Sequence, residues 1–129
     1  MRRLDDAGGM AGTVATLADI AAGASIQAVT HVRIWQFEPC PGREREFAAA
    51  YASEGAWAEL FQQAEGFIGT TLLAPAEPGG SWLTIDRWES KLAFEQFQAS
   101  LGEAYRSLDD TLSELTAAEH FIGAFDDPP

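Results

Sequence analysis

Two kinds of apolar spacing follow each other along this sequence, and their order restricts the fold more than any other feature. Alternating stretches rich in aromatic and β-branched residues predict strands, whereas apolar residues three or four positions apart predict helices. Strands are predicted at residues 31–37, 67–74, 82–88 and 119–125. Helical spacing fills residues 43–65 and 90–115. The order is therefore β-α-β-β-α-β, which is typical of a ferredoxin-like α+β fold.

Glycines and capping residues divide the two predicted helical regions. In the first, Gly55 interrupts the apolar stripe and predicts a kink. In the second, Ser90 is a suitable N-cap, and Gly102 beside a capping box that begins at Ser100 predicts two consecutive helices at an angle. The Pro- and Gly-rich residues 75–80 predict a turn, so that the second and third strands form a hairpin.

The predicted sheet carries large side chains on both faces. Right-handed crossovers place the first strand beside the third in a four-stranded antiparallel sheet, and both helical regions cover one face. One face would carry His31, Arg33, Trp35, Phe37, Trp82, Thr84, Asp86 and Trp88, and the other Val32, Ile34, Leu83 and Ile85. A face exposed to water should be polar, which neither set is. We therefore expect the uncovered face to pack against a second copy of the chain in a homodimer.

The length and composition predict one globular domain with an N-terminal extension. The chain has 129 residues, of which 47% are hydrophobic and 11% aromatic, enough to form a real core. Residues 1–29 are rich in Ala, Gly and Thr and contain no aromatic residue. We interpret them as an arm that is either disordered or a short helix lying on the body or on a partner subunit. The domain itself is expected to span residues 30–126.

The acidic charge disfavours two classes of partner. A formal net charge of −12 disfavours binding to nucleic acid or to an anionic membrane. No stretch approaches the roughly 20 apolar residues of a membrane helix.

Cys40 is the only cysteine, and neither His31 nor His120 belongs to a metal-ligand motif. These features predict a cytoplasmic protein without an internal disulfide or a bound metal.

Two motifs and the order of elements together resemble a known family. Residues 83–90, LTIDRWES, lead into Ala93 and Phe94, and residues 66–70 read GFIGT. With the β-α-β-β-α-β order, they resemble the antibiotic biosynthesis monooxygenase (ABM) domains of the dimeric α+β barrel superfamily. The resemblance covers about residues 30–126. It implies two sheets facing each other in a dimer and one pocket per subunit, between the helices and the sheet.

The resemblance implies several functions, which the residues separate in part. Family members include cofactor-independent monooxygenases that oxidise polyphenols to quinones, haem-degrading enzymes and proteins without known activity. The haem-degrading pattern calls for an Asn, a Trp and a His where this sequence has Trp35, Phe97 and Ser107. Without the axial His, haem iron would lack its usual ligand, so haem degradation is not expected here. The quinone-forming members need no cofactor, and none is expected for this chain.

The same resemblance suggests candidate site residues for a small aromatic or polyketide-like substrate. Such chemistry needs an aromatic pocket, a group that stabilises the substrate anion and a proton acceptor. The anion could be stabilised by Arg33 or Arg87, and the proton accepted by His31, Asp86 or His120. We take Arg87, Asp86 and His31 as the catalytic candidates. The substrate-binding candidates are Trp57, Tyr51, Trp88, Phe94, Phe97 and Arg33.

Each of these candidates also has a purely structural interpretation. The tryptophans fit a core or a dimer interface as well as a pocket, and a single His on a strand is commonly structural. Arg33 and Asp86 lie on the same predicted face of neighbouring strands, where a cross-strand salt bridge would explain both. The alternative to an enzyme is therefore a non-catalytic, small-molecule-binding or regulatory dimer of the same fold.

Overall fold

The computed structural model describes residues 29–128, so the predicted arm lies outside the described residues apart from Val29. The elements are β1 Thr30–Pro39, α2 Glu44–Tyr51, α3 Ala56–Phe61, β2 Phe67–Leu73, β3 Trp82–Trp88, α4 Lys91–Leu112, a short 3₁₀ turn η2 Ser113–Leu115 and β4 Thr116–Asp127. This is the predicted β-α-β-β-α-β order, with the first helical region divided in two. The ferredoxin-like α+β prediction is confirmed.

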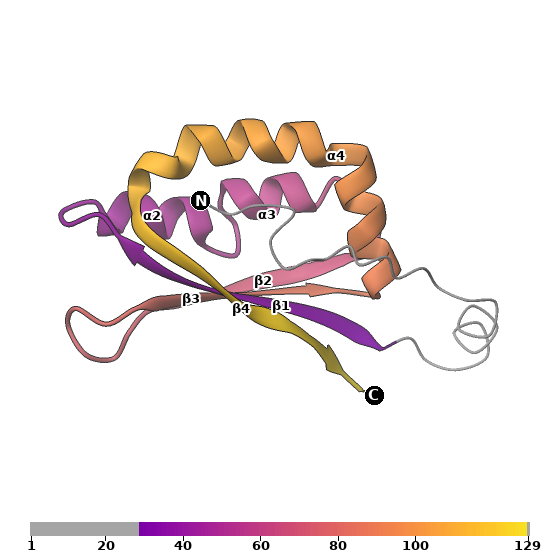
Figure 1. Cartoon of the computed structure of the whole chain (residues 1–129), viewed down its shortest axis with the longest axis horizontal. Helices are drawn as coiled ribbons and strands as arrows, with labels where there is room; N and C mark the ends of the chain where they lie inside the picture. The colour runs from indigo at the N-terminus through magenta and orange to yellow at the C-terminus, as the bar shows by residue number, and fades with distance from the viewer. Residues whose placement is uncertain (1–28, 129) are drawn as a thin grey trace.

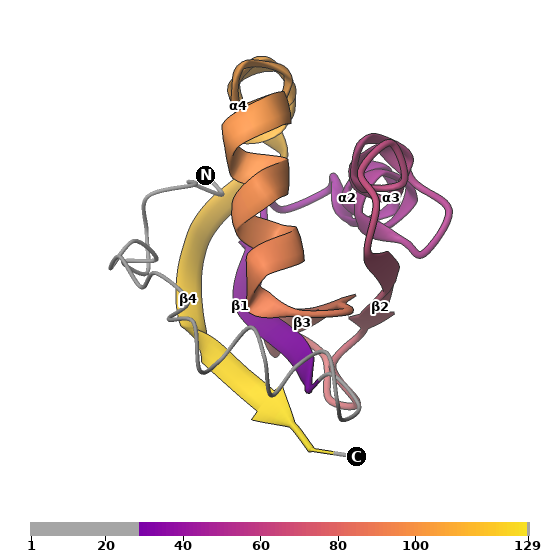
Figure 2. The ribbon, with the colours of Figure 1, turned by 90° about the vertical axis from the view of Figure 1, so that its right-hand side faces the viewer.

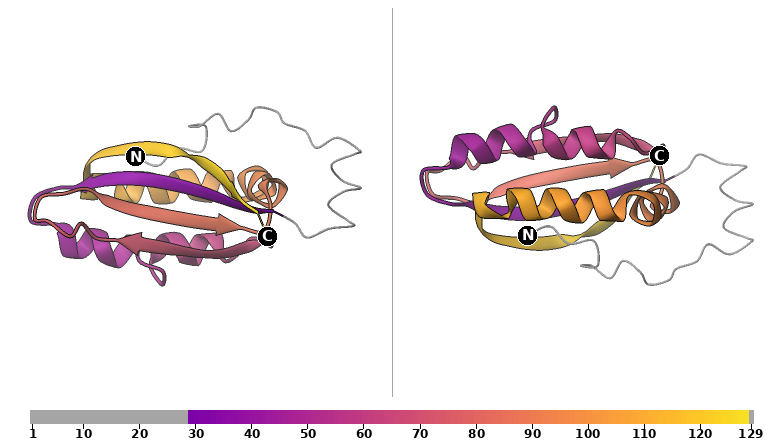
Figure 3. Two further views of the ribbon diagram at one scale, coloured as in Figure 1. Left: turned by 90° about the horizontal axis from the view of Figure 1, so that it is seen from below. Right: turned by 90° about the horizontal axis from the view of Figure 1, so that it is seen from above.

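The four strands form one antiparallel sheet in the order β2-β3-β1-β4. β1 therefore lies beside β3, as the crossover rule predicts, and its other edge pairs with β4. The described helices all lie on one face of this sheet (Figures 1 and 2). On that face, α2 and α3 lie above the β2 side, and α4 lies beside them, toward the other edge of the sheet. Seen from below, in the left panel of Figure 3, none of the helices formed by residues 29–128 covers the second face.

Both predicted irregularities in the helices are present. Gly55 is the N-cap of α3, and a Cβ there would overlap the carbonyl oxygens of Ala49 and Ala50, so the chain can pass this point only with glycine. α4 changes direction at Leu101, whose φ of −120° and ψ of 18° are not helical (Figure 1). The Ser90 N-cap is also confirmed, because its Oγ accepts a hydrogen bond from the Ala93 amide.

The C-terminal strand is longer than its alternation predicts. The predicted strand ends at residue 125, but Asp126 pairs with His31 and Asp127 with Thr30. The first residues of β1 offer β4 backbone partners, and this pairing outweighs the low strand propensity of Asp.

An aromatic core fills the space between the sheet and the helices. Its rings come from every layer, and the buried cluster comprises Trp35, Phe37, Phe47, Tyr51, Trp57, Leu60, Phe61, Trp88, Phe94, Phe97 and Tyr105. Ring pairs such as Trp57–Tyr105, with centroids 4.9 Å apart, and Trp88–Phe97, at 5.1 Å, link α3 and β3 to α4. Such pairs add about 1 kcal/mol each beyond the area they bury.

The two sheet faces carry the side chains that the alternation predicts. His31, Arg33, Asp86 and Trp88 are buried beneath the helices. The uncovered face carries the second set: Val32, Ile34, Leu83 and Ile85, joined by Phe125 opposite Val32 and Leu73 opposite Leu83. Phe125 and Leu73 are 47% and 45% exposed. In the described part of the chain, no helix is both long and apolar enough for a membrane crossing.

Candidate functional site

A row of buried polar side chains crosses three strands on the helix-covered face. Arg33 of β1 lies directly opposite Asp86 of β3, and Asp86 lies opposite Thr70 of β2. The Thr70 hydroxyl donates a 2.6 Å hydrogen bond to Oδ1 of Asp86. All three residues are at most 7% exposed. Charged side chains this deeply buried are stable only when hydrogen bonds or opposite charges replace their contacts with water. The row therefore forms a preorganised polar site within an otherwise aromatic core.

The guanidinium of Arg33 lies between two phenylalanine rings. Its Cζ is 4.0 Å from the centroid of Phe94 on α4 and 4.7 Å from that of Phe121 on β4. Guanidinium stacking on ring faces is favourable, and more so where water is excluded. The cation is thereby fixed in position, so that it can act on a nearby developing negative charge.

His31 continues this face toward the end of the sheet. It is 4% exposed, lies opposite Trp88 on one side and Asp126 on the other, and its ring centroid is 5.7 Å from that of Phe94. Burial is the largest cause that lowers the pKa of His31 from 6.5 to about 4; the positive charges of Arg33 and Lys91 contribute to this shift, and Asp126 opposes it. Its Nε2 has no hydrogen-bond partner among the described residues. At neutral pH, His31 is therefore a neutral imidazole beside a fixed cation.

The aromatic candidates divide into two groups. Trp88 and Phe94 border the polar row, since Trp88 lies opposite His31 and Phe94 contacts both Arg33 and His31. Phe97 packs on Trp88 and Phe94 from the next turn of α4. Tyr51 and Trp57 lie toward the other helices: Tyr51 is stacked on Phe47, and Trp57 makes tilted ring contacts with Phe61 and Tyr105. The five rings are 6% exposed or less.

Two of the candidates lie away from this group. Arg87 pairs with Val32 and Gly69 and so faces the uncovered side of the sheet. His120 lies opposite Gln36, three positions along β1 from Arg33, and is exposed. Within one chain, neither side chain shares a site with Arg33, His31 and Asp86.

Sequence reasoning missed two residues of the polar site. Thr70 belongs to the GFIGT segment that carries the resemblance, but its contact with Asp86 depends on the β2–β3 register, which a bulge between Phe67 and Gly69 shifts. Phe121 reaches Arg33 because a second bulge, between Ile34 and Trp35, sets the β1–β4 register. Alternation alone could suggest which face each residue occupies, but it could not place these bulges.

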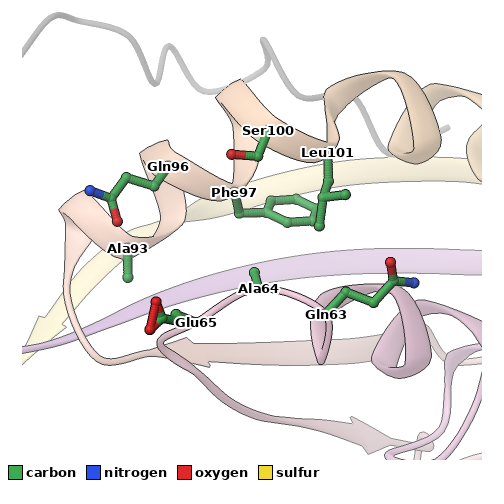
Figure 4. Close-up of a pocket in the computed structure, with 8 residues that line it drawn as sticks. All are labelled: Gln63, Ala64, Glu65, Ala93, Gln96, Phe97, Ser100 and Leu101. Carbon is green, nitrogen blue, oxygen red and sulfur yellow. The ribbon is translucent and has the colours of Figure 1, made fainter.

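A groove of about 540 Å³ opens between the loop after α3 and the first half of α4 (Figure 4). Residues 63–65 form one wall, and Ala93, Gln96, Phe97, Ser100 and Leu101 of α4 form the other. Phe97 therefore belongs both to this groove and to the aromatic core. Among the described residues, the His, Cys, Asp and Glu side chains form no group of three or more that could hold a metal ion.

A model of the family described as "Antibiotic biosynthesis monooxygenase" matches residues 30–121, which is most of the chain. This protein belongs to the ABM family. The match covers the sheet and helices that build the polar row, and β4 through Phe121, so the site described above lies within the ABM domain. A search of curated proteins found no match.

Solved structures share the fold of this ABM protein. SnoaB from Streptomyces nogalater, a cofactor-independent oxygenase, is 25% identical, with a TM-score of 0.51, over 78% of this chain and 92% of SnoaB. Rv0793 from Mycobacterium tuberculosis is 20% identical, with a TM-score of 0.54, over 76% and 97%. SO0527 from Shewanella oneidensis is 16% identical, with a TM-score of 0.56, over 79% and 93%.

Proposed function

We propose that this ABM protein is a cofactor-independent monooxygenase that oxidises a small, electron-rich phenol, aromatic or polyketide-like, to a quinone. The observation that carries the proposal is the Arg33 guanidinium, buried and held between Phe94 and Phe121, with a neutral His31 two residues along the same strand face. Membership of the ABM family supports the proposal, and so does the 25% identity to SnoaB, which is described as a cofactor-independent oxygenase.

The reaction begins with ionisation of the bound phenol. His31 accepts the phenol proton, and Arg33 stabilises the phenolate that forms. A neutral His31 is in the right protonation state at neutral pH, although its low pKa makes it a weak base when the site is empty. A phenolate beside Arg33 would offset the positive charge that lowers this pKa, so proton acceptance becomes easier as the substrate ionises.

Dioxygen then oxidises the phenolate directly. One electron passes from the phenolate to dioxygen, and the resulting superoxide bonds to the ring carbon para to the phenol oxygen. The peroxide anion takes up the proton held by His31. Loss of the ring C–H proton then cleaves the O–O bond, which leaves a carbonyl and releases hydroxide, and the hydroxide and proton form water. One phenol and one dioxygen thus yield one quinone and one water.

The surroundings of Arg33 favour this chemistry. Trp88, Phe94 and Phe121 exclude water, which strengthens the attraction between the guanidinium and a phenolate. The Thr70–Asp86 hydrogen bond holds the carboxylate opposite Arg33 in a fixed orientation. We therefore assign Arg33 and His31 as catalytic residues, Asp86 as a positioning residue, and Phe94 and Trp88 as the pocket wall.

Dioxygen uptake with a panel of polyphenols tests the proposal. Arg33→Met keeps much of the side-chain volume but removes the charge, and we expect it to lower kcat/KM by about two orders of magnitude or more. Arg106→Met, at an exposed position of α4, is the matched control and should retain wild-type uptake. Equal uptake by wild-type and Arg33→Met protein, both folded, would refute the assignment.

The alternative function is binding without turnover. Its support is the close packing of the candidate pocket, where Trp57, Trp88 and Phe97 are each 1% exposed. A regulatory module would bind an aromatic ligand, as judged by quenching of tryptophan fluorescence, without consuming dioxygen. Uptake of dioxygen in proportion to the quinone formed would exclude this alternative.

The assembly proposed for this function is a cytoplasmic homodimer. The support is the uncovered sheet face, which carries Val32, Ile34, Leu83 and Ile85 and lies on the side away from the described helices. Burying this face against a second copy would remove its apolar side chains from water. A sequence with the single cysteine Cys40 fits a reducing compartment.

A further inference from the structure

The groove between the α3–β2 loop and α4 has the features of a ligand site separate from the polar row. Its volume of about 540 Å³ lies in the range of small-molecule sites, roughly 300–1,000 Å³. Phe97 and Leu101 reach from α4 toward Ala64 on the loop and form the apolar part of its lining (Figure 4). Gln63 on the loop and Gln96 on the helix supply a side-chain amide on each wall.

The shape of the groove favours a flat molecule. At one end, the loop closes on α4 where Gly66 meets Ala93, so tightly that a Cβ on Gly66 would lie 2.5 Å from the Cβ of Ala93. At this end, the loop and the helix therefore cannot approach each other further. A planar ring could lie against Ala64, Leu101 and Phe97, whereas a bulky branched ligand would meet the closed end.

The charges of the groove favour an uncharged molecule. Glu65 is the one charged residue among those that line it, and the whole chain carries −12. An anion would be repelled, but hydroxyl and carbonyl groups would find donors and acceptors in the amides of Gln63 and Gln96. The polar row differs in this respect, because Arg33 suits the ionised form of the same kind of molecule.

The groove also borders the irregular part of α4, next to the aromatic core. Phe97 lines it, is 1% exposed, and packs against Phe61, Trp88 and Tyr105 on its inner side. α4 loses its regular geometry at Leu101, one turn along, and Leu101 itself lines the groove. A rotation of the helix about this irregular residue would move Phe97 out of the core.

We propose that this groove is an entry site, in which a neutral, planar aromatic molecule with hydroxyl or carbonyl edges binds before Phe97 admits it to the aromatic core. The class of ligand rests on the proposed function. The order of events follows from the charges: the neutral phenol binds at the groove, beside Glu65, and ionises only at Arg33.

The test is a titration of the full-length protein with naphthol, a neutral planar phenol, followed by NMR of the side-chain amides of Gln63 and Gln96. Naphthol should shift both amides, and naphthoate, its anionic counterpart, should bind at least about tenfold more weakly. Ser100→Trp fills the groove and should weaken naphthol binding by about tenfold or more. Ala99→Trp adds the same side chain at the neighbouring exposed position, outside the groove lining, and should bind naphthol as the wild type does.

The outcomes separate this inference from the proposed oxidation. Amide shifts that Ser100→Trp abolishes support the groove as a site, even if no phenol is ever oxidised. Naphthol that leaves both amides unchanged, or that binds Ser100→Trp as tightly as the wild type, overturns the entry site. If dioxygen uptake still depends on Arg33 in that case, the proposed oxidation is supported although the entry site is refuted.

Discussion

At the residue scale, the buried hydroxyl of Thr70 should stabilise the fold through Asp86. Thr70→Val keeps the shape of the side chain but leaves the 2% exposed carboxylate without this donor. We expect a loss of about 1–3 kcal/mol in the free energy of unfolding, measured by urea denaturation. Thr71→Val, at the exposed neighbouring position, is the control and should change stability by no more than about 0.5 kcal/mol. Equal stability of the two variants would show that the hydrogen bond contributes nothing.

His31 should make stability depend on pH in the mildly acidic range. Its pKa is about 4 in the folded chain and 6.5 in the unfolded chain, so between these values the unfolded state binds more protons. Stability is full above about pH 6.5 and falls as the pH is lowered toward 4, by at most about 3 kcal/mol from this residue. His31→Gln should flatten that part of the stability–pH curve, as measured by denaturation at a series of pH values. A curve unchanged by the substitution would contradict the low pKa.

At the scale of elements, the contact of Gly66 with α4 should be sensitive to a single methyl group. Gly66 has a φ of 89°, and an added Cβ would meet Ala93. Gly79 has a φ of 83° but open space around it, so Gly79→Ala reports the cost of the backbone conformation alone. We expect Gly66→Ala to lower the free energy of unfolding by about 1–3 kcal/mol more than Gly79→Ala. Adding Ala93→Gly to the Gly66→Ala variant removes the clashing Cβ and should recover part of the lost free energy of unfolding. A double variant no more stable than Gly66→Ala would refute the steric explanation.

The sequence predicted the elements better than it predicted the contacts between them. Alternation and helical spacing gave the order of the elements along the chain, and Gly55 and Gly102 marked the break and the bend in the helices, because these features depend on local geometry. The same alternation placed Asp86 and Arg87 on opposite faces of the sheet. Which of the two faces the helices cover depends on the packing of the whole domain. The contacts of Arg33 with Phe121 and of Asp86 with Thr70 depend on two bulges that no local pattern marks. The groove combines residues of a loop and a helix, so its volume arises only once both are packed.

At the scale of the whole molecule, the uncovered sheet face should hold the proposed dimer together. Phe125 is 47% exposed and lies opposite Val32 on this face. Leu92, on α4, is similarly exposed at 48% but lies on the helical side. Phe125→Glu should shift the protein toward the monomer in sedimentation experiments, because it would place a charge in an apolar interface, whereas Leu92→Glu should not. A wild-type monomer, or dimers of equal stability in both variants, would contradict the proposed interface.

The central claim is that Arg33, in its aromatic surroundings, lets dioxygen oxidise a bound phenol without a cofactor. The most direct test is incubation of metal-free protein with isotopically labelled dioxygen and an electron-rich polyphenol, followed by mass spectrometry of the product. We expect a quinone in which one oxygen atom per turnover comes from dioxygen, formed by the wild type and by Arg106→Met but not by Arg33→Met. A quinone without the label, or label incorporated equally by Arg33→Met, would contradict it.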